Sequence, residues 1–560
     1  MRSPDPQANN GVLLVGGYHG TLRAARRAGP PHEDGASTEE FPPMLERMLE
    51  PWLAKALDQL NKRTAQGLLI FQGEPIPVHS LLLLLKDRLI GILTQAVGEF
   101  CLDPCDRPYL SSANEIVHRF PLLSPLIRSV VAEWATAITI FLQRLHRDKQ
   151  WIADGLQIAE LPPVEAISGT ASDAHAGGHC VLRVCFRGAG CFYYKPRPVT
   201  GEWLWHGLLE GMALLEPELR LPAARVWTDV SRFDYGWAES VFPEESPLAS
   251  NSNGRAAGRL DYWHAAGAML CLAQHTRQTD LHLGNIIATA SGPAVTDAEC
   301  FATPSLNVRT DVALSAEKAA IRDAVESMVR TRLLPNGSVN GWPDVSGFFG
   351  RAAAAPGVKL PKWEIASDGR YHLTSIDAEL VDHPNVPAQT TAVAVLPQIL
   401  SGYRHAAELL IRLRKTLISR GTKWRDVLEN IHAPRMVVRD TLSYGLLLSR
   451  SLEPRHLHSW HRRRNAIVTG LAAGAAVGSP RSLLRAETRA LLAMHIPRFV
   501  IVPGTGTLAS SSWRTLAHDF ALSTPAHAVV AQIEALSTEG IENIQVPALL
   551  CAVLQAEMTP

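Results

Sequence analysis

The chain has 560 residues, of which 46% are hydrophobic and 19% are charged, which is the composition of a folded protein with several domain-sized units or of one large enzyme. Its 54 basic and 54 acidic side chains leave no net charge, which argues against a broadly basic nucleic-acid-binding protein. The eight cysteines form no Cys-x-x-Cys pair, and a disulfide scaffold is not expected at this length.

The N-terminal segment, residues 1–43, is irregular and ends in the Pro- and acid-rich PPHEDGASTEEFPP. Its apolar run is too short for a signal peptide. The most apolar stretch of the chain, HSLLLLLKDRLIGILTQAV, is interrupted by Lys86, Asp87 and Arg88. This stretch therefore predicts a buried helix and not a membrane span. We expect a cytoplasmic protein.

Residues 44–160 repeat apolar side chains with the period of a helix. The period changes to two near residue 180, where VLRVCFRGAGCFYYKPRP predicts two strands joined at Gly188-Ala189-Gly190. Helical patterns return in GEWLWHGLLEGMALLEPEL and in DYWHAAGAMLCLAQHT.

Loops or insertions are predicted at 242–258, 333–347 and 352–363, before a further helical block at 392–495. The predicted class is α+β, rich in helix, with a small antiparallel sheet in a central core. We divide the chain into consecutive segments: a loose start at 1–43, a helical region at 44–160, a core with the nucleotide and metal site at 161–330, an insertion at 331–391, and a helical C-terminal part at 392–560.

One stretch, TDLHLGNIIATASGPAVTDAEC (279–300), concentrates side chains that bind metals and transfer protons. It reads as a loop, a strand, a Ser-Gly-Pro turn and a second strand ending at Asp297, and such a hairpin brings Asn285 beside Asp297. Two oxygen donors there suit Mg²⁺ with substrate phosphates. Asp280 can accept a proton from a hydroxyl, as the catalytic-loop Asp of a protein kinase does. His282 has no counterpart in protein kinases, and Asp-x-His-x-x-Asn is closer to lipid kinases.

Phosphoryl transfer also needs a cation on the nucleotide phosphates. Lys195, at the end of the predicted second strand, is the candidate. The chain contains no GxxxxGK[ST] loop, which excludes an ordinary P-loop nucleotide site.

Taken together, these segments make the chain resemble the dehydratase domain of class II lanthipeptide synthetases, whose fold is similar to that of a lipid kinase. The resemblance covers about residues 90–510 and rests on five segments in order: SDAHAGGHCV (172–181), YYKPRPV (193–199), YGWAES (235–240), TDLHLGNII with VTDAECF, and PRMVVRDTLSYGLLL (434–448).

The resemblance implies a two-step reaction on a ribosomally made precursor peptide with a leader and a Ser/Thr-containing core. ATP and Mg²⁺ are the implied cofactors, and no zinc is expected. The residues implied for phosphorylation are Lys195, Asp280, His282, Asn285, Asp297 and Glu299, with Glu239 on the nucleotide side. Those implied for elimination of phosphate, which yields dehydroalanine or dehydrobutyrine, are Arg435 and Thr441, with Asp173 and His175.

The chemistry supports this division. Arginine holds phosphate bidentately, so Arg435 suits the leaving group, and we expect Arg439 one turn later on the same helical face. Thr441 can donate a hydrogen bond to the phosphate. Removal of the α-proton needs a base, for which His175, oriented by Asp173, is our candidate.

Two departures from the family pattern stand out. MHIPRF (494–499) carries His495 where the family has Asp, and the chain lacks the Cys-His-Gly segment of the zinc cyclase. We expect no cyclase domain, so thioether closure would be spontaneous or would need a separate cyclase. Two other functions remain open: a peptide or small-molecule kinase without elimination, and a degenerate protein that only binds leader peptides.

Overall fold

The computed structural model divides the chain into two compact units, each assembled from separate stretches. Unit 1 comprises residues 1–196, 354–380 and 438–497, and unit 2 comprises 197–353, 381–437 and 498–560. The structure describes residues 22–24, 43–64, 66–97, 118–169, 175–241, 261–306, 316–335, 344–350, 353–365, 371–380, 390–474 and 479–558. The described residues are rich in helix and form several small antiparallel sheets, so the chain is α+β, as the sequence predicts.

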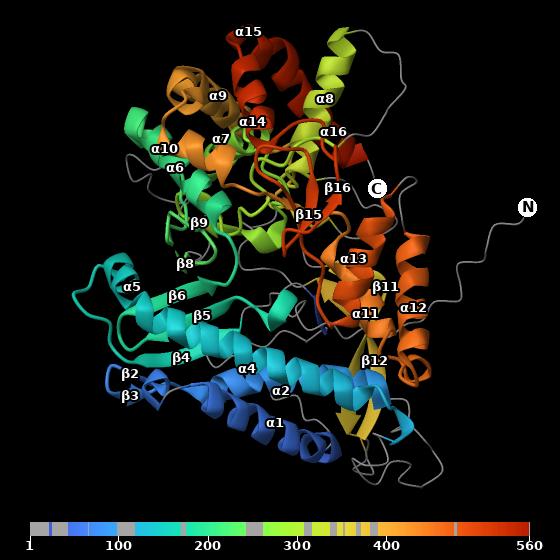
Figure 1. The fold of residues 1–560 in the computed structure, drawn as a ribbon. Coiled ribbons are helices and arrows are strands. Elements are labelled where there is room, and N and C mark those ends of the chain that lie inside the picture. The colour runs from blue at the N-terminus through green and yellow to red at the C-terminus, as the bar shows by residue number, and fades with distance from the viewer. Residues whose placement is uncertain are drawn as a thin grey trace, which may run out of the picture. The chain divides into compact units, whose positions relative to one another are not determined.

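The N-terminal part of unit 1 is helical, which confirms the pattern read in residues 44–160 (Figure 1). Its helices are α1 (Pro43–Arg63), α2 (Val78–Val97), α4 (Leu123–Arg147) and α5 (Lys149–Leu156), with η2 (Gln66–Leu69) and the short strands β2 (Ile70–Phe71) and β3 (Glu74–Pro75) between α1 and α2. Leu81, Leu85 and Leu89 are buried at every fourth position of α2, so this apolar stretch is a core helix.

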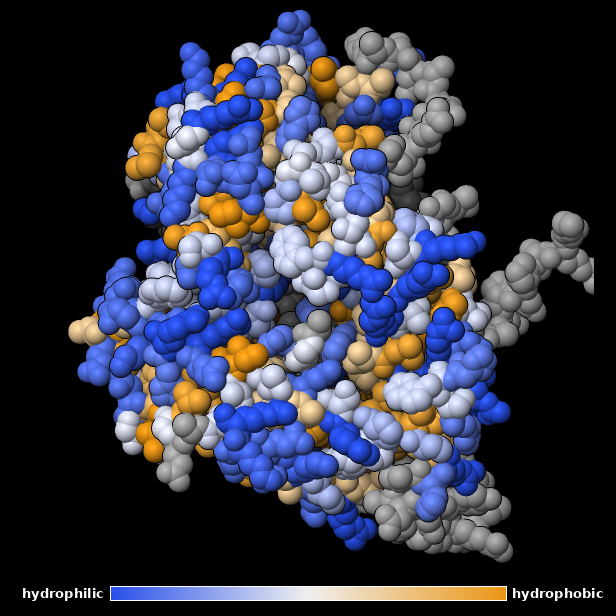
Figure 2. Space-filling model, in the orientation of Figure 1, coloured by the Kyte–Doolittle hydropathy of each residue, from blue (hydrophilic) through white to orange (hydrophobic). Residues whose placement is uncertain are grey.

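Among the described residues, α4 alone is long and apolar enough to cross a membrane by length and composition. Of its most apolar window, 61% is buried inside the protein, as in a core helix. On the face drawn in Figure 2, hydrophilic residues cover most of the surface and hydrophobic ones lie in small separate patches.

Strands β4 (Val164–Gly169), β5 (Leu182–Phe186) and β6 (Gly190–Lys195) form an antiparallel ladder in unit 1. The β5–β6 hairpin confirms the prediction, with Leu182 opposite Tyr194. Cys185 faces Cys191 across it, and the two are joined by a disulfide bond.

The prediction of a loop at 352–363 is wrong. Ala353–Ile365 form strand β11, which lies next to β12 (Tyr371–Leu380), and β12 in turn pairs with β1 (Leu22–Ala24). Pro356 and Pro361 favour a loop in the sequence, yet both are accommodated in this strand, where an edge position requires fewer N–H donors.

The remaining elements of unit 1 lie in its first stretch, for η4 (Ala176–Gly178), and in its third stretch, for the others. The others are α11 (Thr441–Arg450), η9 (Pro454–His456), α12 (Trp460–Ala473) and α13 (Arg481–Leu492). A small core of Tyr444, Ile467, Leu471, Leu491 and Ile496 holds α11, α12 and α13 together.

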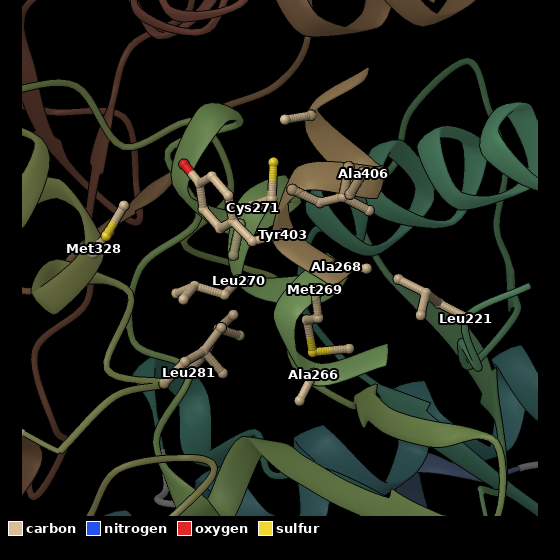
Figure 3. Close-up of a cluster of buried hydrophobic side chains, with 14 of the residues drawn as sticks. Leu221, Ala266, Ala268, Met269, Leu270, Cys271, Leu281, Met328, Tyr403 and Ala406 are labelled. Carbon is tan, nitrogen blue, oxygen red and sulfur yellow. The ribbon is translucent and has the colours of Figure 1, made fainter. Parts of the chain in front are cut away.

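Unit 2 is built around two tightly crossed helices, α7 (Tyr262–His275) and α9 (Leu396–Ile418). A Cβ on Gly402 would lie 1.8 Å from the carbonyl oxygen of His264, so only glycine permits this approach. Every residue of α7 except His264 is buried, and Figure 3 shows the apolar cluster that it forms with Leu221, Leu281, Met328 and Tyr403. This core fixes the end of α7, from which the candidate site begins.

The other helices of unit 2 surround this pair. They are α6 (Thr200–Leu215), η5 (Pro217–Leu219), η7 (Leu283–Asn285), α8 (Ala316–Arg330), α10 (Lys423–Asn430), α14 (Pro525–Ala535), α15 (Thr538–Gly540), η10 (Ile541–Gln545) and α16 (Val546–Met558).

Three small antiparallel ladders complete unit 2. Their strands are β7 (Val226–Trp227) with β8 (Gly236–Glu239), β9 (Ile286–Thr289) with β10 (Gly292–Val295), and the sheet β13 (Arg435–Met436), β14 (Phe499–Ile501), β15 (Leu508–Ser510) and β16 (Thr515–Ala517).

Candidate active site

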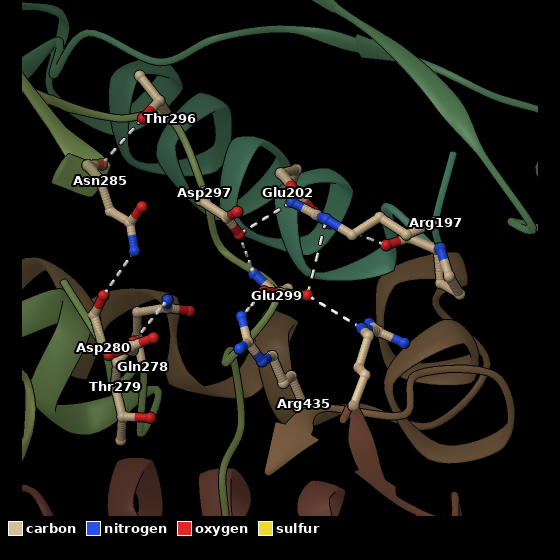
Figure 4. Close-up of polar contacts among 12 residues, drawn as sticks. Arg197, Glu202, Gln278, Thr279, Asp280, Asn285, Thr296, Asp297, Glu299 and Arg435 are labelled. Atoms are coloured by element: carbon tan, nitrogen blue, oxygen red, sulfur yellow. Dashed lines mark hydrogen bonds and ion pairs between the residues drawn. The ribbon is translucent and has the colours of Figure 1, made fainter. Parts of the chain in front are cut away.

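The loop after α7 places Asp280 in a left-handed backbone conformation, with φ of 63°. Its carbonyl oxygen accepts a hydrogen bond from Nδ2 of Asn285 at 2.8 Å, which ties the loop to the start of the hairpin (Figure 4). The carboxylate of Asp280 lies 3.9 Å from Nε of Arg332. Non-glycine residues adopt positive φ at a cost, and such positions cluster at functional sites.

The β9–β10 hairpin brings the two predicted metal ligands to its open end, as the sequence predicts. Ile286 pairs with Val295, and the next residue, Thr296, donates its backbone N–H to the carbonyl oxygen of Asn285 at 2.9 Å. Asp297 follows directly. The predicted strand limits are slightly wrong, because Gly292 and Pro293 lie within β10 and the strand ends at Val295.

His282 is held by local hydrogen bonds in front of η7. Its Nδ1 accepts from the backbone N–H of Gly284 at 3.1 Å, and its Nε2 lies 3.4 Å from Nδ2 of Asn285. Burial lowers the pKa of His282, although the nearby Asp280 opposes this shift. A neutral ring that accepts at Nδ1 is therefore a positioning element for the Asp280–Asn285 loop.

A buried network of arginines and carboxylates extends from Asp297. Arg197 contacts Oε1 of Glu202 at 2.7 Å, Oδ1 of Asp297 at 2.9 Å and Oε2 of Glu299 at 3.6 Å. The backbone N–H of Glu299 also donates to Oδ1 of Asp297 at 3.0 Å. Burial alone would lower the pKa of Arg197, but the charges of Asp297, Glu202 and Glu299 outweigh it and the pKa is raised.

Arg435 and Arg498 complete the network on the other side of Glu299. Arg435 pairs with Oε1 of Glu299, and Nε of Arg498 lies 3.2 Å from Oε2. Burial would lower the pKa of Arg435, but the Glu299 carboxylate raises it, so this guanidinium remains charged. The network thus joins two of the predicted phosphorylation residues, Asp297 and Glu299, to the predicted elimination arginine within unit 2 (Figure 4).

The predicted placement of Arg435 and Arg439 on one helical face is wrong. Arg435 lies in β13 of unit 2, whereas Arg439 precedes α11 in unit 1. Nε of Arg439 contacts Glu487 at 2.7 Å, and the hydroxyl of Tyr444 donates to the same carboxylate oxygen at 2.8 Å. Arg439 therefore helps to fix α11 against α13.

The other predicted residues lie in different elements. Lys195 is the buried last residue of β6 in unit 1, and Thr441 begins α11 in the same unit. Nδ1 of His175 lies 3.3 Å from the carbonyl oxygen of Ile496. Glu239 ends β8 in unit 2, with Oε2 at 3.5 Å from Nε of Arg225. Asp173 lies outside the described residues.

His495, where the family pattern has Asp, is itself paired. Its Nε2 lies 2.8 Å from Oε2 of Glu133 on α4, within unit 1. The imidazole of His495 therefore contacts the carboxylate of Glu133, which gives histidine a local structural role at the position where the family pattern has Asp.

Mg²⁺ fits the donor set at the hairpin end. Asn285 and Asp297 offer one amide and one carboxylate oxygen group, and Mg²⁺ binds through few protein oxygens while keeping waters and substrate phosphates. No group of three or more His, Cys, Asp or Glu side chains able to hold a metal occurs in the part of the chain that the structure describes. A metal here would depend on Asp297, which in this structure pairs with Arg197.

Three members of the network were not predicted as site residues: Arg197, Glu202 and Arg498. Arg197 and Arg498 follow proline in the segments KPRP and HIPRF. KPRP belongs to a motif that carries the family resemblance, and HIPRF is the segment that departs from the family pattern at His495, so the comparison with the family is the signal that could have identified both arginines.

The comparison with family models gives one match, a domain of unknown function (DUF4135), over residues 120–501, more than half of the chain. The chain belongs to the DUF4135 family. This family is associated with lanthipeptide synthetase-like proteins. No curated protein matches the chain.

The DUF4135 domain contains the whole arginine–carboxylate network, from Arg197 to Arg498. Helices α14, α15 and α16 lie beyond it and belong to unit 2.

Proposed function

We propose that this chain dehydrates Ser and Thr residues of a ribosomally made precursor peptide, by phosphorylation followed by elimination of phosphate. The observation that carries the proposal is the contact of Arg435 with Glu299. Through it, the arginine suited to a leaving phosphate shares one buried network with the hairpin suited to metal and nucleotide phosphates.

In the first step, Asp280 would accept the proton of the peptide hydroxyl while the hydroxyl oxygen forms a bond to the γ-phosphorus of ATP and the bond from that phosphorus to the departing ADP breaks. ATP, when bound, supplies the phosphoryl group, and Mg²⁺ supplies positive charge beside it. Asn285 and Asp297 are the residues that would hold the metal. Lys195 would bind nucleotide phosphates as the strand lysine of kinases does.

In the second step, a base removes the α-proton of the phosphorylated residue. The electrons of the C–H bond form the Cα=Cβ double bond, and the Cβ–O bond breaks to release phosphate. Arg435 would stabilise the departing phosphate, with Thr441 as a hydrogen-bond donor. His175 is the proposed base: its Nδ1 must donate to the Ile496 carbonyl, which leaves Nε2 able to accept a proton.

A kinase without elimination is the second candidate. It uses the same hairpin residues, Asn285 and Asp297, and the same Asp280 loop, which Asn285 ties to the hairpin, but needs neither Arg435 nor Thr441. The two functions differ in product: a kinase leaves phosphate on the peptide, whereas a dehydratase releases the phosphate and the α-proton, so that the product is one water lighter than the original peptide.

The test is incubation of the full chain with ATP, Mg²⁺ and the peptide encoded beside it, followed by mass spectrometry. We expect the loss of one water mass per modified residue, dependent on ATP. Arg435→Gln should leave phosphopeptide behind. Stable phosphopeptide from the wild-type chain would favour the kinase, and an unchanged peptide mass, with no binding of Mg-ATP, would refute both.

A further inference from the structure

The carboxylate of Glu299 lies between two buried guanidinium groups. Arg435 pairs with its Oε1, and Nε of Arg498 lies 3.2 Å from its Oε2. The three side chains are 9 to 14% exposed. One arginine for each oxygen of a single anionic group is the arrangement by which arginines hold phosphate as well as carboxylate.

The β13–β14 ladder explains why the two arginines converge. Arg435 pairs with Val500, and Met436 pairs with Phe499. Arg498 stands two residues before Val500, so it is the diagonal neighbour of Arg435 and points to the same face of the ladder. Arg435 thus lies in β13 and Arg498 directly precedes β14, so the paired strands fix the backbone at or next to each arginine.

The network contains three arginines and three carboxylates, but two of the arginines meet at the single carboxylate of Glu299. Arg197 has two closer partners, Glu202 at 2.7 Å and Asp297 at 2.9 Å. Arg435 and Arg498 thus share the single negative charge of Glu299. A phosphate monoester carries close to two negative charges at neutral pH and would match this pair of arginines better.

We propose that Arg435 and Arg498 form a phosphate clamp that Glu299 fills in this structure, and that a phosphate dianion binds there when the Glu299 side chain moves aside. Arg498 is then a second residue that holds the leaving phosphate during elimination. This assignment of the phosphate to a phosphopeptide rests on the proposed function, whereas the clamp itself does not.

The clamp is tested with inorganic phosphate and the full chain, by isothermal titration calorimetry. Glu299→Gln removes the competing charge, so we expect phosphate to bind roughly tenfold tighter or better than to wild type. Adding Arg498→Gln to this variant should abolish the gain. Binding to Glu299→Gln that is no tighter than to wild type, or a gain that survives Arg498→Gln, would overturn the clamp.

Glu429→Gln is the matched control. Glu429 contacts Arg425 at 2.5 Å, and Arg425 is as buried as Arg498. This control frees one buried arginine in the same unit, without a second arginine beside it. We expect its phosphate affinity to equal that of wild type, and an equal gain would mean that any freed arginine attracts phosphate.

Folding of each variant is checked by circular dichroism and thermal unfolding. Should Glu299→Gln not fold, Glu299→Asp withdraws the carboxylate by one methylene and should give a smaller gain. In the wild-type chain, phosphate should also slow modification of Arg435 and Arg498 by phenylglyoxal, read by mass spectrometry. Equal modification rates with and without phosphate would contradict the clamp.

A synthetic phosphoserine peptide separates this inference from the proposed function. Arg498→Gln should slow release of phosphate from it, with partial recovery in Arg498→Lys. Tight phosphate binding without any elimination by wild type would leave the clamp standing and refute the dehydratase. Elimination unaffected by Arg498→Gln, with no phosphate gain in Glu299→Gln, would refute the clamp alone.

Discussion

Glu299 and Arg435 are joined twice. The backbone N–H of Arg435 donates to the carbonyl oxygen of Glu299 at 2.8 Å, and the two side chains form an ion pair that is largely excluded from water. The residues are far apart in the sequence, so the double link fixes β13 against the segment that follows the β9–β10 hairpin. Changes at Arg435 should therefore affect both folding and chemistry.

Replacing Arg435 with Gln should destabilise the fold by about 3–5 kcal/mol, because it leaves the buried Glu299 carboxylate short of a partner. Arg404→Gln is the control: Arg404 contacts Glu542 at 2.6 Å, but the two side chains are 39% and 52% exposed. Such an exposed pair contributes at most about 1 kcal/mol. Urea unfolding of the two variants measures the difference, and equal losses would show that the Arg435 pair is not energetically special.

Two substitutions at Asp280 separate its proposed role in proton transfer from the backbone strain at this position. Asp280→Asn should reduce ATP-dependent phosphorylation by roughly 10²–10⁴-fold, because the amide cannot accept the hydroxyl proton. Its stability should change little, since Asn tolerates the left-handed conformation seen at φ of 63°. Asp280→Ala should lose the same activity and also about 1 kcal/mol of stability. Retained phosphorylation in Asp280→Asn would remove Asp280 from the mechanism.

Stability should fall in mild acid because unit 2 buries neutral histidines. His432 accepts at Nδ1 from Thr200 at 2.8 Å and donates from Nε2 to the Phe301 carbonyl at 2.7 Å. Burial lowers the pKa of His432 to about 4, and it lowers that of His275 to about 4. In the unfolded chain the pKa of histidine is about 6.5, so as the pH falls the unfolded chain binds these protons before the folded protein does.

Each of these neutral histidines therefore adds to the free energy of unfolding above pH ~6.5. This contribution, at most roughly 3 kcal/mol for each histidine, is lost as the pH falls towards 4. We expect His432→Gln to have a smaller loss of unfolding free energy between pH 7 and pH 5 than wild type. The measurement is urea unfolding at both pH values, with exposed His461→Gln as the control. A pH dependence unchanged by His432→Gln would contradict this origin.

Asp297 is the residue on which metal binding should depend most. Its Oδ1 lies 2.9 Å from a guanidinium nitrogen of Arg197, so a metal must compete with this pair. Asp297→Asn should abolish binding of Mn²⁺, used as a spectroscopic substitute for Mg²⁺ and followed by electron paramagnetic resonance. Glu542→Gln, at a surface carboxylate, should leave the affinity unchanged. Equal Mn²⁺ affinity in wild type and Asp297→Asn would exclude this site.

Local patterns in the sequence predict much of this fold. The two hairpins, β5–β6 and β9–β10, follow from alternating apolar residues beside Gly-containing turns. The helical period identifies α2, α6 and α7 close to their observed ends. Strand β11 was missed because Pro356 and Pro361 indicate a loop, and only its partner β12 provides the reason for a strand.

In the candidate site, too, the contacts between residues close in the sequence could be predicted and the long-range contacts could not. Asp280, Asn285 and Asp297 are close in the sequence, and local hydrogen bonds link Asp280 to Asn285 and Asn285 to Thr296, the residue before Asp297. The sequence places Arg435 in a helix because apolar residues continue without a break into α11. In the structure α11 begins only at Thr441, where Asp440 accepts a hydrogen bond from the backbone N–H of Ser443 at 2.7 Å. The contacts of Glu299 with Arg435 and Arg498 join residues that are far apart in the sequence, so no local sequence pattern predicts them.

The two units share the chain in an interleaved way, with junctions after residues 196, 353, 380, 437 and 497. Three of these junctions lie within three residues of Lys195, Arg435 and His495. Neither unit can therefore be expressed as one continuous fragment, and a protease that cuts at one junction leaves the others intact. Limited proteolysis should yield nicked but associated protein, and the two proposed steps must be separated by point substitutions in the whole polypeptide.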